Sequence, residues 1–240
     1  MDKEIFLTIV IPMFNEARRI APFLNDVIKY VNRCTYNYEI LLVDDGSTDD
    51  TVPLIKNLLK QHVPGRYRIE QLKPNQGKGS ALRTGMLAAR GSYILFLDAD
   101  GSTAITELDN FIPTFSADHD IYIAVRTKKH SEPLKRKLFG YGYILLANCI
   151  LGMWLSDFTC GFKCYSRQAA RTVFNRQRFN NWSFDAEDLF IAKKLDYRIK
   201  EIPVYWKHVG GSKVRVFTNV IVCGIDLLKI RVNGLLGRYR

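Results

Sequence analysis

The sequence predicts an α/β fold in which helices flank a mostly parallel, Rossmann-like sheet. Short apolar runs rich in β-branched residues recur along the first half of the chain, as at residues 6–11 and 38–43. Such runs are typical of strands that are buried on both faces. Segments with the apolar periodicity of a helix separate them, as at residues 16–31. This alternation favours parallel strands joined by right-handed crossovers.

The boundaries of these elements follow from the residues that end them. Pro12 ends the first strand, and the polar turn at residues 44–47 ends the second. Helices are expected to run to residue 60 and over residues 77–90, where Gly91 stops the second of them. Further strands are expected at residues 68–72, 93–97 and 121–125.

The composition is that of a folded protein with a large positive charge. The 240 residues are enough for one domain with a substantial core, and the formal net charge is +11. This charge favours an anionic partner such as a nucleotide, a lipid phosphate or a membrane surface, although a solvated basic face explains it equally well. The sequence shows no stripe of interleaved aromatic and basic residues, so nucleic acid is not expected as a partner.

The cysteines and the apolar segments indicate a cytoplasmic protein. The five cysteines show no paired CxxC spacing, which favours reduced thiols. Residues 1–4 are mostly polar, so no signal peptide is expected. Residues 138–155 come closest to a membrane span but fall short of the roughly 20 apolar residues that one needs. They are expected to form a buried or an interfacial helix.

Three predicted strands end in polar clusters, at residues 14–16, 44–45 and 98–100. Ligands of parallel sheets bind beyond the carboxyl ends of the strands, so these clusters should converge on one crevice. Asp98 and Asp100 lie two positions apart and can face one point. There, Mg²⁺ or Mn²⁺ would offset the repulsion between their carboxylates. An acidic turn in water is the alternative.

Two further segments indicate a nucleotide at this crevice. Asp44 and Asp45 can accept hydrogen bonds from a ribose hydroxyl or a base N–H, although a simple turn would also use them. Because no protein partner for these carboxylates is evident, they are expected to serve ligand binding and not folding. Residues 75–79 resemble a phosphate-binding loop without the Walker spacing, and a glycine turn before a helix is the alternative.

Together these segments resemble the family 2 inverting glycosyltransferases, through the motifs at residues 8–16, 43–49, 75–79 and 98–100. The resemblance implies the GT-A fold, a UDP- or GDP-sugar donor and a divalent metal, Mg²⁺ or Mn²⁺. It extends to about residue 215 through residues 98–101, 157–163 and 206–214. These later motifs resemble the polyprenyl-phosphate glycosyltransferases, and among them the dolichyl-phosphate β-glucosyltransferases.

The resemblance assigns donor-binding roles at each strand end. It implies that the base and ribose pocket is lined by Pro12, Phe14, Glu16, Val43, Asp44 and Asp45. Asp98 and Ala99 are implied to lie under the ribose and the diphosphate, and Asp100 to be the main metal ligand, with Asp98 beside it. Lys78 and Lys213 are expected to bind the nucleotide sugar, although solvated charge explains Lys213 equally well.

Catalytic roles are implied for three further residues. Arg126 looks like the family's phosphate-binding arginine, and Asp157 is a candidate for the sugar or acceptor site. Many members place a general base at Asp188, but a phosphate acceptor, with a second pKa of about 6, is largely ionised at neutral pH. Asp188 is therefore expected to orient groups, and a helix N-terminal acid is the alternative.

The expected activity is transfer of glucose from UDP-glucose to a polyprenyl or dolichyl phosphate at a membrane surface. A donor such as GDP-mannose or a UDP-N-acetylhexosamine, or a hydroxyl acceptor on a glycan, is the alternative within the enzyme class. A nucleotide-sugar-binding regulator without turnover is the alternative outside it.

The chain is expected to divide into a catalytic domain and a C-terminal segment. Residues 1–215 form the domain, with a nucleotide-sugar-binding half at 1–130 and an acceptor half at 131–215. Residues 216–240 are amphipathic and basic. Such a segment can lie in a membrane interface, here on the cytoplasmic face. Packing against the sheet or in a homodimer interface is the alternative.

Overall fold

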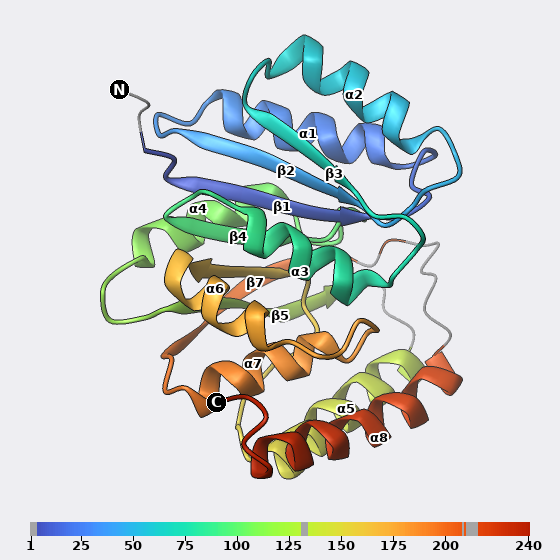
Figure 1. Ribbon diagram of the computed structural model, residues 1–240, viewed down its shortest axis with the longest axis vertical. Coiled ribbons are helices and arrows are strands. Elements are labelled where there is room, and N and C mark those ends of the chain that lie inside the picture. Colours follow the sequence, from blue (N-terminus) through green and yellow to red (C-terminus); the bar gives the residue numbers. More distant parts are fainter. Residues whose placement is uncertain (1–3, 131–133, 208, 210–215) are drawn as a thin grey trace.

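The computed structural model describes residues 4–130, 134–207, 209 and 216–240, and Figure 1 shows helices on both faces of one twisted sheet. The strands are β1 Leu7–Met13, β2 Tyr38–Asp44, β3 Tyr67–Gln71, β4 Tyr93–Leu97, β5 Ile121–His130, β6 Phe162–Ser166 and β7 Ile199–Lys207. The helices are α1 Ile20–Asn32, α2 Thr51–His62, α3 Lys78–Ala88, α4 Leu108–Phe111, α5 Leu134–Leu151, α6 Arg167–Arg176, α7 Phe184–Lys194 and α8 Val216–Leu235. Short 3-10 turns flank α4 at η1 Ile105–Glu107 and η2 Ile112–Thr114.

The strands lie in the order β3-β2-β1-β4-β6-β5-β7. Neighbours are parallel except at β6, which runs antiparallel to both β4 and β5. The mostly parallel sheet is confirmed, whereas β6 and β7 have no counterpart among the strands expected from the sequence. Because two antiparallel pairings in succession restore the direction, β5 points the same way as β4 and ends at the same edge.

Pro12 lies inside β1, so the expectation that it ends the first strand is wrong. The reason is the unequal length of the neighbouring strands. β4 pairs with β1 only as far as Val10, which lies opposite Phe96. Pro12 lies beyond this pairing, where its missing N–H breaks no ladder hydrogen bond with β4.

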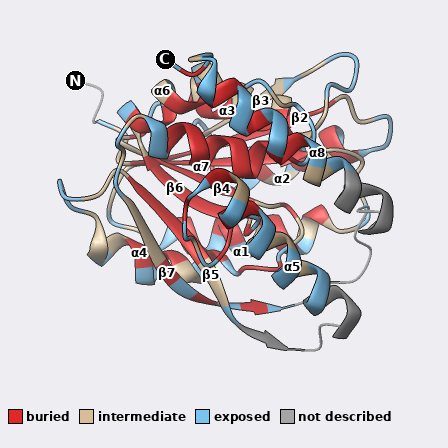
Figure 2. Ribbon diagram, turned by 90° about the horizontal axis from the view of Figure 1, so that it is seen from below, coloured by how far each residue is buried: buried red, intermediate tan, exposed pale blue. Residues whose placement is uncertain are grey.

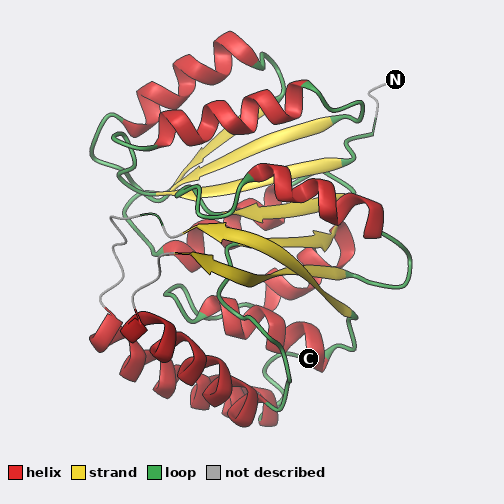
Figure 3. Cartoon of the chain, turned by 180° about the vertical axis from the view of Figure 1, so that it is seen from behind, coloured by secondary structure: helices red, strands yellow, loops and turns green. Residues whose placement is uncertain are grey.

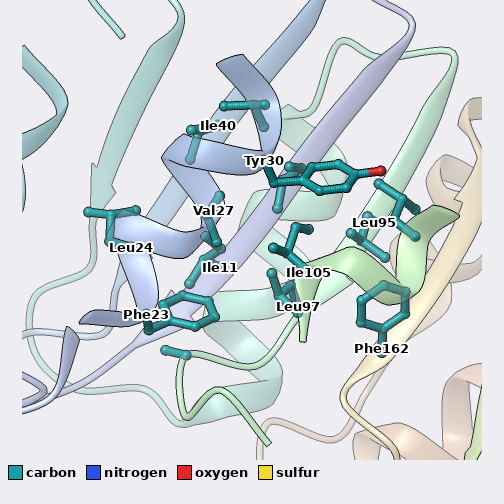
Figure 4. Packing of buried hydrophobic residues seen from close by; sticks show 14 of the residues in the cluster. Ile11, Phe23, Leu24, Val27, Tyr30, Ile40, Leu95, Leu97, Ile105 and Phe162 are labelled. Carbon is teal, nitrogen blue, oxygen red and sulfur yellow. The ribbon is translucent and has the colours of Figure 1, made fainter. Parts of the chain in front are cut away.

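Alternate side chains of the central strands enter two separate cores. Leu7, Ile9 and Ile11 of β1 pack under α1 and α2, whereas Val10 faces α3. Figure 4 shows the first core, in which apolar side chains of α1 pack over the strands. Figure 2 shows the strands buried between the helices, whose outer faces are exposed.

The second core brings α3 very close to the sheet. A Cβ atom at Gly85 would lie 2.4 Å from Cγ1 of Val10 and 2.9 Å from Cγ2 of Val43. The missing side chain therefore allows α3 to settle on β1 and β2. This contact positions the start of α3, at Lys78, beside the carboxyl ends of these strands.

α5 and α8 lie side by side at one end of the molecule, next to α7 (Figures 1 and 3). α8 buries Leu227 and Ile230 in the second core. No helix within the described ranges is long and apolar enough to cross a bilayer.

Candidate functional site

The loops that follow β1 and β2 are bound to each other at the carboxyl edge of the sheet. The N–H of Asn15 donates to Oγ of Ser47 (2.8 Å), and the side-chain oxygen of Asn15 accepts from the N–H of Thr48 (2.8 Å). Asn15 has a φ of 52°, a left-handed conformation that asparagine tolerates. The N–H of Glu16 donates to Oγ1 of Thr51 (2.8 Å). These bonds hold the first two strand ends together.

Asp44 and Asp45 are buried and have partners within the protein. Oδ1 of Asp45 accepts from the N–H of Gln76 (2.8 Å), and Oδ2 accepts from the N–H of Gly77 and the side chain of Asn75 (both 2.9 Å). Burial raises the pKa of Asp45, and the two N–H groups partly offset this effect. The premise that these carboxylates lack protein partners is therefore wrong, because Asp45 anchors the loop before α3.

The first residue of α3 is bound to the end of β4. Nζ of Lys78 lies 2.6 Å from Oδ1 of Asp98. The ammonium group also lies 4.9 Å from the ring centre of Trp182 and 5.4 Å from that of Phe96, within cation–π range. Burial disfavours the charged ammonium, but the surrounding carboxylates outweigh this cost and raise the pKa of Lys78. Lys78 is thus a positive charge at the carboxyl edge of the sheet.

Gly161, just before β6, determines where Asp98 points. The N–H of Asp98 donates to the carbonyl oxygen of Gly161 (2.9 Å). A Cβ atom at Gly161 would lie 2.0 Å from Oδ2 of Asp98, so only glycine leaves room for the carboxylate. Burial raises the pKa of Asp98, and Lys78 partly offsets this rise.

Asp100 is the carboxylate of this turn that is best placed to hold a metal ion. Its Oδ1 accepts from the N–H of Ser102 (2.9 Å), which orients the group, while Asp98 is already paired with Lys78. In the part of the chain that the structure describes, no three His, Cys, Asp or Glu side chains form a metal-binding group by themselves. Mg²⁺ often binds through one or two carboxylates, waters and substrate phosphates. Asp100, with Asp98 beside it, fits a metal ion that also contacts a diphosphate.

Arg126 and Asp157, identified separately in the sequence, form one ion pair. Nε and Nη2 of Arg126 lie 2.6 and 2.8 Å from the two carboxylate oxygens of Asp157. Nη2 also donates to the hydroxyl of Thr159 (2.6 Å). Burial alone would raise the pKa of Asp157, but Arg126 outweighs burial and lowers it. Arg126 lies at a register shift within β5, three positions beyond Ile123, and Ile123 and Phe96 both pair with Lys163 of β6, so the ion pair lies near the level of Asp98 in the sheet.

The three acids of α7 have different surroundings. Asp185 forms an ion pair with Lys163 of β6. Glu187 accepts a hydrogen bond from the hydroxyl of Tyr239 (2.7 Å) and therefore holds the C-terminal residues. Asp188 is 1% exposed, and its Oδ1 has no hydrogen-bond partner among the described residues. Burial and then Glu187 raise the pKa of Asp188 well above its usual range, which favours the protonated acid.

The remaining residues assigned to donor binding are only partly placed at the crevice. Val43 is fully buried under α3, so its side chain does not line the crevice. Lys213 lies outside the described residues. The structure places at the strand ends Pro12, Phe14, Glu16 and Ala99. Lys163 and Asp185 received no role from the sequence, although Lys163 ends the segment 157–163 that carries the resemblance and Asp185 lies three positions before Asp188.

Comparison with known proteins gives one consistent family. The profile described as Glycosyl transferase family 2 matches residues 8–174. The chain is 32% identical to dolichyl-phosphate β-glucosyltransferase of Dictyostelium discoideum, over 98% of this chain and 77% of that protein. It is 34% identical to the Saccharomyces cerevisiae protein of the same name, over 100% of this chain and 78% of that protein.

A solved structure supports the fold. Glucosyl-3-phosphoglycerate synthase from Mycobacterium tuberculosis, in complex with Mn²⁺, UDP and glucosyl-3-phosphoglycerate, is similar with a TM-score of 0.66 and 18% identity. The similarity covers 97% of this chain and 79% of that one. At this identity the similarity is evidence of a shared fold alone.

We predict that Asp45→Ala lowers the melting temperature by several degrees. The change removes the acceptor of the N–H groups of Gln76 and Gly77, and each of these partly buried hydrogen bonds contributes about 0.5–1.5 kcal/mol. Thermal unfolding and hydrogen exchange at these two amides measure the effect, with the exposed Asp118→Ala as control. Unchanged stability and exchange in Asp45→Ala would show that Asp45 does not anchor this loop.

We predict a pH-dependent loss of stability in Arg126→Met. Without Arg126, the carboxylate of Asp157 is buried unpaired, at a cost of about 3–5 kcal/mol near neutral pH. In the wild type the lowered pKa of Asp157 adds stability above its unfolded pKa of about 3.9, and this stability is lost as the pH falls further. In the variant, burial without Arg126 raises the pKa of Asp157, so the unpaired carboxylate becomes protonated as the pH falls and the melting-temperature deficit should shrink towards pH 4.

The control is the double variant Arg126→Met with Asp157→Asn, which removes both charges and should regain most of the stability at neutral pH. A deficit in Arg126→Met that is equal at pH 4 and pH 7.5 would contradict the electrostatic explanation.

Proposed function

The chain belongs to glycosyl transferase family 2, and from this premise we propose that it transfers glucose from UDP-glucose to a dolichyl-type polyprenyl phosphate. The observation that carries the proposal is the extent of the similarity to dolichyl-phosphate β-glucosyltransferase, which covers 98% of the chain. It therefore includes both the donor side and the acceptor side of the sheet edge. The fold is the GT-A fold, with a seven-stranded sheet between helices in the described residues.

The donor is proposed to bind across the carboxyl ends of β1, β2 and β4. The end of β2, at Asp44 and Asp45, would face the base and the ribose. Lys78 lies at the start of α3 beside Asp98, where its ammonium group would offset the charge of the diphosphate. A helix N-terminus at the same place adds a favourable dipole for phosphate.

The residues present fit a divalent ion, Mg²⁺ or Mn²⁺, held by Asp100 with Asp98 beside it. When bound, the ion neutralises charge on the departing diphosphate. Gly161 and Ser102 fix the two carboxylates in position, and Lys78 prevents Asp98 from repelling Asp100.

The acceptor is proposed to be its own nucleophile. An oxygen of the lipid phosphate forms a bond to the anomeric carbon, the bond from this carbon to UDP breaks, and UDP leaves with the electron pair, so the configuration inverts. With a second pKa of about 6, this phosphate is largely ionised at neutral pH and needs no general base. Asp188, which is buried and favours its protonated form, is consistent with this chemistry. Arg126, oriented by Asp157, would help to stabilise the charge of the departing UDP.

A membrane surface is proposed to bring the lipid acceptor to the site. Among the described residues, the exposed large apolar side chains other than Trp182 and Tyr205 all lie within residues 138–154 and 222–236. On α8 they form one stripe at helical spacing, with Val222, Ile225, Leu228, Val232 and Leu235.

The opposite side of α8 is buried, so this helix packs on the domain and also presents an apolar face outwards. Basic residues lie beside this face, among them the exposed Lys229, Arg231 and Arg238. An apolar face flanked by cations matches the requirements of an interfacial helix on anionic lipid. Peripheral attachment through α5 and α8 is therefore preferred to a homodimer interface.

We predict that the purified protein transfers labelled glucose from UDP-glucose to a polyprenyl phosphate when Mg²⁺ or Mn²⁺ is present. Asp100→Asn should reduce transfer by at least a hundredfold while the melting temperature is kept, since loss of one charge-stabilising group costs about 10²–10³ in rate. Asp188→Asn should have a milder effect, because the acceptor is already ionised. GDP-mannose, a UDP-N-acetylhexosamine and a glycan acceptor are the competing substrates.

Preferred transfer to the glycan hydroxyl, with activity lost in a folded Asp188→Asn variant, would favour the alternative acceptor. Full activity in EDTA would contradict the metal requirement, and UDP binding without any turnover would favour a regulator.

We predict that the protein floats with vesicles of phosphatidylcholine and phosphatidylserine at low salt and less at high salt. Leu228→Glu and Val232→Glu should lower the bound fraction, because each places a charge in the apolar stripe. Tyr205→Glu, at an exposed position outside α5 and α8, is the matched control. If the folded wild type does not float, or if Leu228→Glu converts a dimer to a monomer without changing flotation, the face is a protein interface instead.

A further inference from the structure

Lys163 and Asp185 form a buried ion pair behind the crevice. Lys163 comes from β6, the antiparallel strand between β4 and β5, and its side chain is 2% exposed. Asp185 lies in the first turn of α7 and is 5% exposed. A buried pair of this kind costs desolvation energy that a well-packed apolar pair would avoid. Its presence is therefore weak evidence of a contribution to stability.

The pair lies close to the contact between Lys78 and Asp98. The ammonium groups of Lys78 and Lys163 lie 5.4 and 5.8 Å from the ring centre of Phe96. Asp185 stabilises the ammonium of Lys78 and interacts unfavourably with Asp98. The charges of these four groups, two positive and two negative, cancel one another, and Asp100 adds a further negative charge near Lys78 and Asp98.

We propose that Lys163 and Asp185 are positioning residues for the donor site: Lys163 neutralises Asp185, and Lys78 therefore stays on Asp98. The inference rests on the proposed use of a nucleotide-sugar donor, and it adds to that function two residues that do not touch the substrate.

The physical reason is competition for one cation. Asp98 and Asp185 both attract Lys78, and the flexible lysine side chain can change partner. Lys163 compensates the charge of Asp185 and so leaves Asp98 as the stronger partner. Without Lys163, Asp185 would draw Lys78 towards α7. Asp98 would then be unpaired next to Asp100, and the cation beside the diphosphate would be lost.

The test compares Lys163→Met, Asp185→Asn and the double variant, because the double variant restores neutrality. UDP affinity is measured by calorimetry with Mn²⁺, and the KM for UDP-glucose is separated from kcat. Lys163→Met should weaken UDP binding and raise the donor KM roughly tenfold, with a smaller change in kcat. Lys163→Arg, which keeps the charge, and the double variant should bind UDP within about threefold of the wild type.

A control removes a partly buried ion pair at the opposite edge of the sheet. Nε of Arg68 lies 2.7 Å from Oε1 of Glu39, near the start of β2. Arg68→Met should lower the melting temperature and leave UDP affinity and donor KM unchanged. A purely structural role of Lys163 would give this same pattern in Lys163→Met and would overturn the proposal.

Crystal structures of the wild type and Lys163→Met provide a readout that needs no donor. The proposal expects Nζ of Lys78 to leave Asp98, 2.6 Å away in the wild type, and to move towards Asp185. The proposal is overturned if Lys78 stays on Asp98 in Lys163→Met. It is also overturned if the folded double variant binds UDP as weakly as Asp185→Asn, because Asp185 would then contact the donor itself. If Lys163→Met does not fold, Asp185→Asn, in which the unpaired Lys163 competes with Lys78 for Asp98, should bind UDP more weakly than the neutral double variant, and equal affinities of the two would overturn the proposal. A wild type that binds UDP but transfers no glucose would refute the proposed function and leave this test intact.

Discussion

An ion pair between Lys78, the first residue of α3, and Asp98, which follows β4, joins this helix to the carboxyl edge of the sheet. It forms only because α3 settles closely on the sheet at Gly85 and because Gly161 leaves room for the carboxylate. At both positions the Cβ atom of any other residue would collide with neighbouring atoms, so both contacts depend on glycine. The position of Lys78 beside Asp98 thus depends on the close packing of α3 on β1 and β2 and on the space that Gly161 leaves for the carboxylate.

The charged groups at this edge are compensated in pairs. Arg126 neutralises Asp157, and Lys163 neutralises Asp185, so neither carboxylate is buried as an unpaired charge. Asp100 has no such cation among the ion pairs of the described residues, which makes it the carboxylate best suited to a divalent ion. The carboxylates of Asp157 and Asp185 are therefore neutralised within the protein, whereas that of Asp100 is available to a ligand.

The C-terminal residues connect the exposed helix pair to the site. Tyr239, which follows α8, donates to Glu187 of α7 (2.7 Å), and Arg176 of α6 donates to the carbonyl oxygen of Tyr239 (3.1 Å). α7 also carries Asp185, the partner of Lys163. The proposed membrane-facing helix and the proposed positioning pair thus lie on neighbouring, hydrogen-bonded elements, which favours a fixed orientation of the site towards the lipid surface.

The sequence by itself determined the strands and helices of the first half, the strand ends at Asp44 and Asp98, and the family, because apolar periodicity and short motifs are local properties. The tertiary structure decided which charges meet. Asp45 binds a loop thirty positions away, and Arg126 binds Asp157 across thirty-one. Such pairings follow from the path of the chain, above all from the antiparallel insertion of β6, and no local pattern encodes them. For the same reason, no local pattern in the sequence predicts that Lys163 and Asp185 form an ion pair.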